Sequence, residues 1–234
     1  EEYLEGEEFS LISFVHHNLV IPMPIAQDHK RLLDGDCGPN TGGMGIYSPV
    51  PIIPKEAVEI AIEEIVKKTV NALISENVEF IGFLYAGLIL TKKGPKVIEF
   101  NARMGDPEAE VILPKLESDI IEVIISLFNS VVETPIWKNQ FNLGIVLASK
   151  GYPDKYETFF PIYGLDEIES HVYHMGTKTE TNKVVTNGGR VLLICGEGKT
   201  LEEAKEKAYN NLKKIKCENL IYRTDIGNKS IEVI

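Results

Sequence analysis

The sequence has few of the residues on which secreted, zinc-binding and membrane-spanning folds depend. Its three cysteines, Cys37, Cys195 and Cys217, are odd in number and far apart, so they indicate neither a disulfide framework nor a zinc cluster. We therefore expect three buried free thiols and a reducing, cytoplasmic location. The longest apolar runs, such as residues 80–90, fall short of the ~20 residues that a membrane helix needs. We expect no membrane partner.

Positive charge is also scarce. The 234 residues include 24 Lys and Arg against 35 Asp and Glu, which gives a net charge of -11. We therefore expect no nucleic-acid partner, although an anionic small substrate needs only local cations. Hydrophobic residues make up 44% of the chain, enough for a core in one large domain or two small ones.

The most informative segment is residues 97–108. Its first residues, Val-Ile-Glu-Phe-Asn, are branched or aromatic at most positions and predict a β-strand. Alternate residues of a strand share a face, so Glu99 and Asn101 project together, and Arg103 joins them if the strand continues. A carboxylate and an amide oxygen suit Mg²⁺, and a guanidinium suits developing negative charge. From these residues alone, a solvated edge strand is the alternative.

Residues 38–45, Gly-Pro-Asn-Thr-Gly-Gly-Met-Gly, predict a loop whose backbone amides can approach an anion. Lys30 and Arg31 precede it as candidate phosphate partners. No Gly-Lys-Ser/Thr sequence follows, so the segment is not a Walker A loop. A flexible surface connection is the alternative.

Hydrophobic periodicity predicts the elements around these segments. Residues 1–15 predict a hairpin that turns near Glu5 and Gly6, and Pro54 opens an amphipathic helix to about Asn77. Residues 80–91 predict a strand that forms an antiparallel hairpin with residues 97–101.

Two helix starts follow that hairpin. Asp106 is the expected N-cap of a helix with Pro107 at its first position, which would turn a helix N-terminus and an anion site toward the strand of Glu99. Ser118 and Asp119 predict the cap of an apolar, buried helix that ends at Phe128.

A boundary is expected near residues 134–140, beyond which short strands predominate. The predicted strands are residues 143–149, 172–176, 183–185 and 190–195. Thr200 and Glu203 form a capping box for a helix over residues 200–216. Residues 186–190 predict a Gly-Gly hairpin turn, and Arg223 and Asp225 could share a face. We expect a structural turn and a surface ion pair; a functional site at either cluster is the alternative.

Together these segments resemble the phosphoribosylamine–glycine ligases (glycinamide ribonucleotide synthetases) of the ATP-grasp superfamily. The matching segments occur in family order at residues 1–10, 28–31, 38–45, 47–49, 82–88, 98–108, 148–153, 186–192 and 223–227. The resemblance implies ligation of glycine to 5-phosphoribosylamine in purine biosynthesis, with ATP converted to ADP and phosphate through a glycyl phosphate. It also implies an α+β fold, with the C-terminal part of an ATP-grasp module at residues 1–135 and a small α+β domain at residues 136–234.

The same resemblance implies roles for individual residues. Glu99 and Asn101 match the ligands of Mg²⁺ or Mn²⁺, and Arg103 matches a catalytic arginine. The implied ATP contacts are Glu1, Glu2, Leu4 and Glu8. The backbone of the first three residues would hold adenine, and the Glu8 carboxylate would hold the ribose hydroxyls. The implied substrate-facing residues are Lys30, Arg31, Asn40, Thr41, Gly42, Gly43, Asp106, Pro107 and Glu108.

The family also has an N-terminal portion that this sequence does not contain. That portion contributes half of the ATP site, so we expect it to be a required partner and this chain alone to be inactive. The alternatives are another ATP-grasp ligase of purine metabolism, or a nucleotide-binding or interaction fragment without independent activity.

Overall fold

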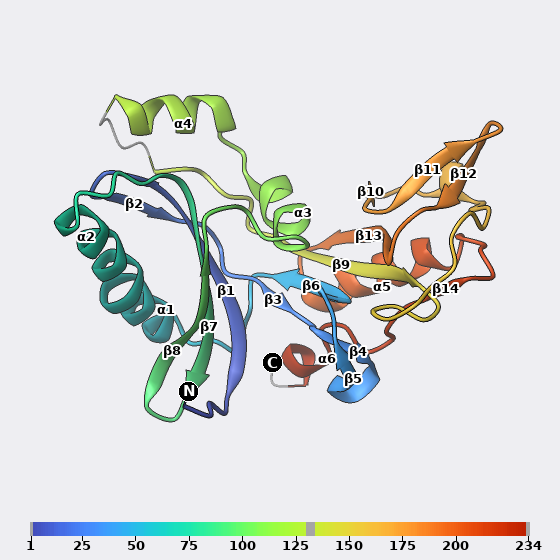
Figure 1. Ribbon diagram of the computed structural model, residues 1–234, viewed down its shortest axis with the longest axis horizontal. Helices are drawn as coiled ribbons and strands as arrows, with labels where there is room; N and C mark the ends of the chain where they lie inside the picture. Colours follow the sequence, from blue (N-terminus) through green and yellow to red (C-terminus); the bar gives the residue numbers. More distant parts are fainter. Residues whose placement is uncertain (1, 130–133, 233–234) are drawn as a thin grey trace. The chain divides into compact units, whose positions relative to one another are not determined.

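The computed structural model describes residues 2–129 and 134–232, which form two compact units (Figure 1). The first unit lies within residues 1–27 and 49–139, and the second within residues 28–48 and 140–234. The long strands of both units pair antiparallel and are accompanied by helices, which confirms the predicted α+β class. The described helices are all too short or too polar to span a lipid bilayer.

The first unit is built on a four-stranded sheet in the order β2-β1-β7-β8. Its strands are β1 (Glu7–His16), β2 (Leu19–Pro22), β7 (Ile81–Thr91) and β8 (Gly94–Asn101). β1 pairs with β7 over its whole length, and β7 and β8 form the predicted hairpin. Residues 2–6 contain no strand, so the hairpin predicted near Glu5 and Gly6 is wrong. Both edges of β1 are already occupied by β2 and β7.

Helices accompany this sheet. The helix predicted from Pro54 is present as α1 (Lys55–Ala61), a π-helical segment (Ile62–Val66) and α2 (Lys67–Ser75), and α1 packs against β8. Asp119 caps α4 (Ile120–Phe128) by accepting a 2.7 Å hydrogen bond from the Ile121 amide, as predicted. The prediction that this helix is buried is wrong, because Ile121 and Phe128 are 60% and 56% exposed. Only one side of α4, with Val123 and Leu127, faces the unit.

The second unit is built on a six-stranded sheet in the order β10-β13-β9-β6-β3, with β14 also paired to β9. Its strands are β3 (Gln27–Asp28), β6 (Gly45–Ser48), β9 (Phe141–Ser149), β10 (Val172–His174), β13 (Arg190–Gly198) and β14 (Leu220–Ile221). Gly45 of β6 lies opposite Ile145 of β9. This pairing joins residues 28–48 to a unit that sequence analysis placed entirely after residue 135. Local patterns do not encode which distant strand a segment joins.

The helix α5 (Leu201–Leu212) packs on β13 and β9. Thr200 caps it through a 3.3 Å bond from the Glu203 amide, and Leu201, Ala204, Ala208 and Leu212 form its buried face, as predicted. The helix ends four residues before the predicted end at Lys216. The second unit also contains η4 (Leu165–Glu167), α6 (Asn228–Ile231), β11 (Thr177–Glu180) and β12 (Lys183–Thr186).

The predicted Gly-Gly hairpin at residues 186–190 is wrong. β12 pairs with β11 in a separate two-stranded sheet, whereas β13 pairs with β9 and β10. The two glycines therefore connect two sheets instead of reversing the chain within one.

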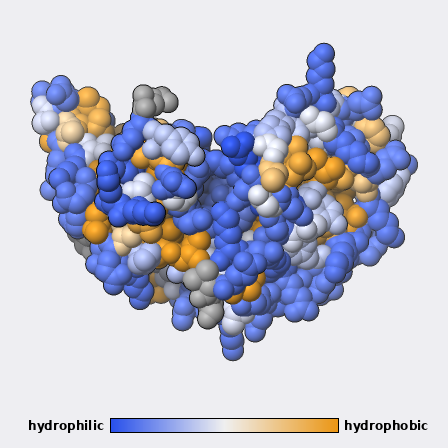
Figure 2. Space-filling view, turned by 90° about the horizontal axis from the view of Figure 1, so that it is seen from below, coloured by the Kyte–Doolittle hydropathy of each residue, from blue (hydrophilic) through white to orange (hydrophobic). Residues whose placement is uncertain are grey.

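The face shown in Figure 2 is largely hydrophilic and interrupted by hydrophobic patches. Of the three cysteines, Cys195 is buried, Cys217 is half-buried and Cys37 is exposed, so the prediction of three buried thiols fails for Cys37. All three are free thiols.

Candidate functional site

Glu99 and Asn101 lie on the same side of β8, as the alternation of strand residues predicts. Asn101 Nδ2 donates a 3.1 Å hydrogen bond to Glu99 Oε1, and Glu99 is exposed. Gly87 of β7 lies opposite Glu99, and a Cβ atom at that position would come within 3.2 Å of Glu99 Cγ. The glycine therefore leaves room for the Glu99 side chain to lie across the neighbouring strand.

This pair offers the donor chemistry that Mg²⁺ requires. The hydrogen bond between the two side chains uses the amide nitrogen of Asn101, which leaves its amide oxygen outside that bond. Residues 2–129 and 134–232 contain no cluster of three or more His, Cys, Asp and Glu able to hold a metal. Mg²⁺ commonly takes only one or two carboxylates from the protein and completes its shell with water and substrate phosphates. Glu99 and Asn101 fit that mode of binding.

β8 ends at Asn101, so Arg103 lies two residues beyond the strand, and it is exposed. Its Nη1 atom donates a 2.9 Å hydrogen bond to the carbonyl of Met104. A guanidinium has five N–H donors, so this bond leaves others for an anion.

The segment after Arg103 differs from the prediction. α3 (Glu108–Ile112) has its N-cap at Pro107 and not at Asp106. Glu108 is only 3% exposed, and its Oε1 atom accepts hydrogen bonds from Ser10 Oγ at 2.7 Å and Tyr85 Oη at 3.1 Å. These contacts point the Glu108 carboxylate into the protein, so it does not have the substrate-facing orientation that we expected.

Gly105 belongs to the same arrangement. A Cβ atom there would lie 2.1 Å from Glu108 Oε2, so a side chain at this position would displace the buried carboxylate. Asp106 is exposed, whereas Pro107 is buried.

The predicted adenine-binding segment lies at the edge of the first unit. Glu2 and Glu8 are exposed and Leu4 is half-buried, whereas Glu1 lies outside the described residues. Residues 2–6, with residues 90–93 and Lys96, line a cavity of about 340 Å³. Glu2 Oε2 lies 3.7 Å from Lys96 Nζ at this cavity. Glu8 is not among the lining residues.

In the second unit, the Gly-rich segment is more ordered than the predicted loop. β4 (Arg31–Leu33), the turn η1 (Asp34–Asp36) and β5 (Cys37–Asn40) form a hairpin, which we call the 31–40 hairpin. Within it, Arg31 Nη1 donates a 2.9 Å bond to the Gly38 carbonyl. At its base, the Lys30 carbonyl accepts bonds from the Thr41 amide at 2.8 Å and the Thr41 hydroxyl at 2.9 Å. Of the Gly-rich residues 38–45, only residues 41–44 lie outside strands.

Side chains from other parts of the unit hold these last residues. The Gly42 amide donates a 2.9 Å bond to the Tyr152 hydroxyl, and the Gly42 carbonyl accepts a 2.7 Å bond from Arg190 Nη1. Gly43 has a φ angle of +115°, and a Cβ atom there would lie 2.5 Å from Asp28 Oδ1. Only glycine fits this position without displacing neighbouring atoms.

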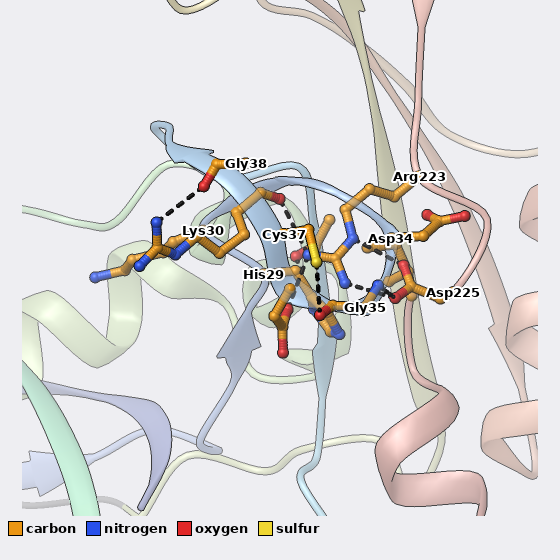
Figure 3. Close-up of polar contacts among 12 residues, drawn as sticks. His29, Lys30, Asp34, Gly35, Cys37, Gly38, Arg223 and Asp225 are labelled. Carbon is orange, nitrogen blue, oxygen red and sulfur yellow. Dashed lines mark hydrogen bonds and ion pairs between the residues drawn. The ribbon is translucent and has the colours of Figure 1, made fainter. Parts of the chain in front are cut away.

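Arg223 and Asp225 share a face, as predicted, but they do not form a surface ion pair. Arg223 is 2% exposed, and its Nε and Nη2 atoms donate to Asp225 Oδ1 and Oδ2 at 2.8 and 2.7 Å (Figure 3). Its Nη1 atom donates to Asp36 Oδ1 at 2.9 Å and to the Arg31 carbonyl at 3.0 Å. Sequence reasoning missed this burial, because residues almost 200 positions apart supply the acceptors.

Electrostatics at this pair follow from burial and hydrogen bonding. Burial alone would raise the pKa of Asp225, but hydrogen bonds from Arg223 and the Gly35 amide outweigh burial and hold the pKa well below its usual range.

Burial, reinforced by the charge of Arg223, lowers the pKa of His29 to about 4. His29 is therefore neutral at pH 7, and its Nδ1 atom lies 3.2 Å from the Gly45 carbonyl.

Comparison with known families identifies both units. The family model described as "Phosphoribosylglycinamide synthetase, ATP-grasp (A) domain" matches residues 1–109, and the model described as "Phosphoribosylglycinamide synthetase, C domain" matches residues 142–229. The chain belongs to the phosphoribosylglycinamide synthetase family. This is a family of ATP-grasp ligases that form carbon–nitrogen bonds, and the resemblance inferred from sequence motifs is thus confirmed.

Curated members of this family match almost the whole chain. The phosphoribosylamine–glycine ligase of Halalkalibacterium halodurans is 54% identical over 233 residues, which are 99% of this chain and 54% of that protein. The Listeria innocua protein of the same name is 50% identical over 98% of this chain and 56% of its own length. The chain thus spans about half the length of these relatives.

Solved structures of related proteins have the same fold as this chain. The crystal structure of phosphoribosylamine–glycine ligase from Thermotoga maritima has a TM-score of 0.88 at 38% identity and covers 96% of this chain and 56% of that one. An L-amino acid ligase from Bacillus licheniformis has a TM-score of 0.62 at 18% identity over 94% of this chain and 55% of that one, which shows a common fold alone.

Proposed function

We propose that this chain supplies part of an enzyme that ligates glycine to 5-phosphoribosylamine. ATP is consumed, and glycinamide ribonucleotide, ADP and phosphate are formed, as a step of purine biosynthesis. The identity of 54% to a phosphoribosylamine–glycine ligase along nearly the whole chain carries this proposal. The chain spans about half of such relatives, so the proposed activity also requires the portion of the family's length that this chain does not contain.

The first unit is proposed to hold the nucleotide and Mg²⁺ or Mn²⁺. The backbone around Glu2 and Leu4, with Glu1, would bind adenine, and Glu8 would accept hydrogen bonds from the ribose hydroxyls. Glu99 and Asn101 would hold the metal, because their oxygen atoms project from one side of β8. A metal bound there would neutralise negative charge on the phosphates.

The reaction needs positive charge and correctly placed substrates, but no covalent protein nucleophile. In the proposed sequence, a glycine carboxylate oxygen attacks the γ-phosphorus of ATP and ADP leaves, which gives glycyl phosphate. The amine of 5-phosphoribosylamine then attacks the acyl carbon, and phosphate leaves. Arg103 would stabilise the charge that develops on the transferring phosphoryl group, and its exposed side chain two residues beyond β8 is consistent with that role.

Substrate contacts are proposed for both units separately. In the second unit, Lys30, Arg31 and the residues Asn40, Thr41, Gly42 and Gly43 would face the substrate through side chains and backbone amides. In the first unit, Asp106 is the exposed member of the predicted turn. The proposal also divides the chain into the C-terminal part of an ATP-grasp module at residues 1–135 and a C-terminal domain at residues 136–234, although residues 28–48 pack within the second unit.

Complementation tests the proposed function. This chain would be combined with a separately produced N-terminal portion of a family member, and ADP release would be measured with and without glycine and 5-phosphoribosylamine. We expect turnover that depends on both substrates, with Glu99→Gln as the inactive control. Two folded portions without turnover would contradict the proposal. Turnover with another carboxylate and amine would indicate a different ATP-grasp ligase, and nucleotide binding without turnover a binding module.

A further inference from the structure

The 31–40 hairpin has little hydrophobic packing to hold it in place. All four residues of β5 and all three of η1 are exposed, and Leu33, the last residue of β4, is 52% exposed. A hairpin of two strands is marginal on its own in water. Its position within the second unit must therefore depend on polar contacts.

Those contacts come from one short segment, residues 223–229. Arg223, itself 2% exposed, donates to the carbonyl of Arg31, the first residue of the hairpin, and to Asp36 in the turn η1. Asp225 accepts a 2.8 Å bond from the Gly35 amide in the same turn (Figure 3). The two side chains thus hold both the base and the tip of the hairpin.

Neighbouring residues complete the attachment. Asp34 accepts a 2.8 Å bond from the Thr224 amide and a second bond from the Thr224 hydroxyl. Lys229 Nζ lies 2.8 Å from Asp36 Oδ2. Tyr209 of α5 donates a 2.8 Å bond to the Arg223 carbonyl, which fixes the segment to the helix that packs on β9 and β13. The hairpin is therefore connected by hydrogen bonds to the core of the unit.

We propose that Arg223 and Asp225 are a positioning pair for 5-phosphoribosylamine binding. The proposal rests on the proposed function, in which Lys30, Arg31 and residues 40–43 face the substrate. It assigns them to 5-phosphoribosylamine, because Lys30 and Arg31 are cations suited to its phosphate. The pair fixes the 31–40 hairpin, and the hairpin in turn places Lys30 and Thr41 at its base, where the Thr41 amide bonds to the Lys30 carbonyl. The pair does not contact substrate, because every N–H of the guanidinium except one on Nη2 donates to the protein acceptors named above.

The chemistry of the pair explains why arginine stands at position 223. A planar guanidinium can make the bidentate bond to Asp225 and still bond to Asp36 and Arg31 through Nη1. A lysine carries the same charge but has one nitrogen, so it cannot replace this set of bonds. Arg223→Lys therefore keeps the positive charge and removes the hydrogen-bond geometry, so its effect reports on the geometry alone.

The test uses Arg223→Lys, Asp225→Asn and Asp34→Ala in the complete enzyme. Asp34→Ala is included because Asp34 is exposed, so this variant is expected to fold even if Arg223→Lys does not. We expect the KM for 5-phosphoribosylamine to rise about tenfold or more in Arg223→Lys and Asp225→Asn, and less in Asp34→Ala, because displaced binding groups lose productive geometry. The KM for ATP stays unchanged. Lys214→Met, which removes a surface contact to Glu169 in the same unit, is the matched control and leaves both constants unchanged.

Hydrogen exchange on the same proteins provides a readout that does not depend on activity. Exchange of amides in residues 31–40 is expected to accelerate in the three variants, while β9 and β13 retain their protection. Faster exchange with an unchanged KM for 5-phosphoribosylamine would overturn the positioning role, and so would unchanged exchange. An equal rise in the KM for ATP would indicate a general structural defect and would also overturn it. Absence of turnover in the unsubstituted enzyme would instead overturn the proposed function.

Discussion

Asn101 donates a hydrogen bond to Glu99 from two residues further along β8, with 3.1 Å between Nδ2 and Oε1. The bond orients a carboxylate and an amide toward each other on one side of a strand before any ligand binds. The bond uses the amide nitrogen, so a cation held by both side chains would replace that N–H at Glu99 Oε1 and meet the Asn101 amide oxygen after the amide turns. The opposing Gly87 keeps the space over β7 clear for this arrangement.

Removal of the Glu99 charge should impair catalysis. In the complete enzyme, Glu99→Gln is expected to lower kcat at least tenfold, because charge stabilisation by a bound metal is worth several kcal/mol and about 1.4 kcal/mol corresponds to a factor of ten. Steady-state ADP release at several Mg²⁺ concentrations measures the effect. Glu76→Gln, at the exposed end of α2, is the control and should retain full activity. Near-normal turnover of Glu99→Gln at low Mg²⁺ would contradict the metal assignment.

His29 should make the stability of the second unit depend on pH. Burial lowers its pKa from 6.5 to about 4, so between these values the unfolded chain binds a proton that the folded chain does not. The contribution of His29 is therefore constant above pH 6.5 and lowers stability as the pH decreases toward 4, by up to about 3 kcal/mol. Asp36 and Asp225, whose pKa values are lowered, contribute their own losses at lower pH.

Urea unfolding between pH 4 and 8 checks this dependence. His29→Gln is expected to flatten the slope between pH 4 and 6.5, whatever its effect on stability at pH 7. His174→Gln removes an exposed imidazole and should leave the slope as it is. A slope unchanged by His29→Gln would show that another group titrates in this window.

The buried Glu108 carboxylate should contribute to stability. Glu108→Ala leaves the hydroxyls of Ser10 and Tyr85 without their acceptor, so the free energy of unfolding should fall by about 2–4 kcal/mol. In a double-mutant cycle, Tyr85→Phe should cost less when combined with Glu108→Ala than in the native protein. Glu117→Ala, which changes an exposed carboxylate in the same unit, should change stability by less than about 0.5 kcal/mol. Additive costs in the cycle would contradict the interaction.

A side chain at position 43 should destabilise the second unit. Gly43→Ala combines a φ of +115° with a Cβ position 2.5 Å from Asp28 Oδ1. Gly94→Ala is the matched comparison, because Gly94 has a φ of +101° but no atom within 4 Å of its Cβ position. Backbone strain alone costs about 1–3 kcal/mol, so chemical denaturation should show a loss in that range for Gly94→Ala and a larger one for Gly43→Ala. Equal losses would exclude a steric contribution from Asp28.

The sequence by itself determined the features that depend on neighbouring residues. Strand alternation placed Glu99 and Asn101 on one face, and the short turn between β7 and β8 set their hairpin. The caps at Asp119 and Thr200 were predictable because a cap joins a side chain to an amide two or three residues away. The order of motifs along the chain was enough to indicate the family.

Only the tertiary structure decided which distant segments meet. It moved residues 28–48 into the second unit through the pairing of β6 with β9, about a hundred residues later. It also turned Glu108 into the protein and buried Arg223 against acceptors from the 31–40 hairpin. Periodicity and capping are short-range signals, whereas burial of a charged side chain depends on partners that the fold brings together. For that reason the sequence predicted a surface ion pair at Arg223, and the fold made it the attachment point of a hairpin.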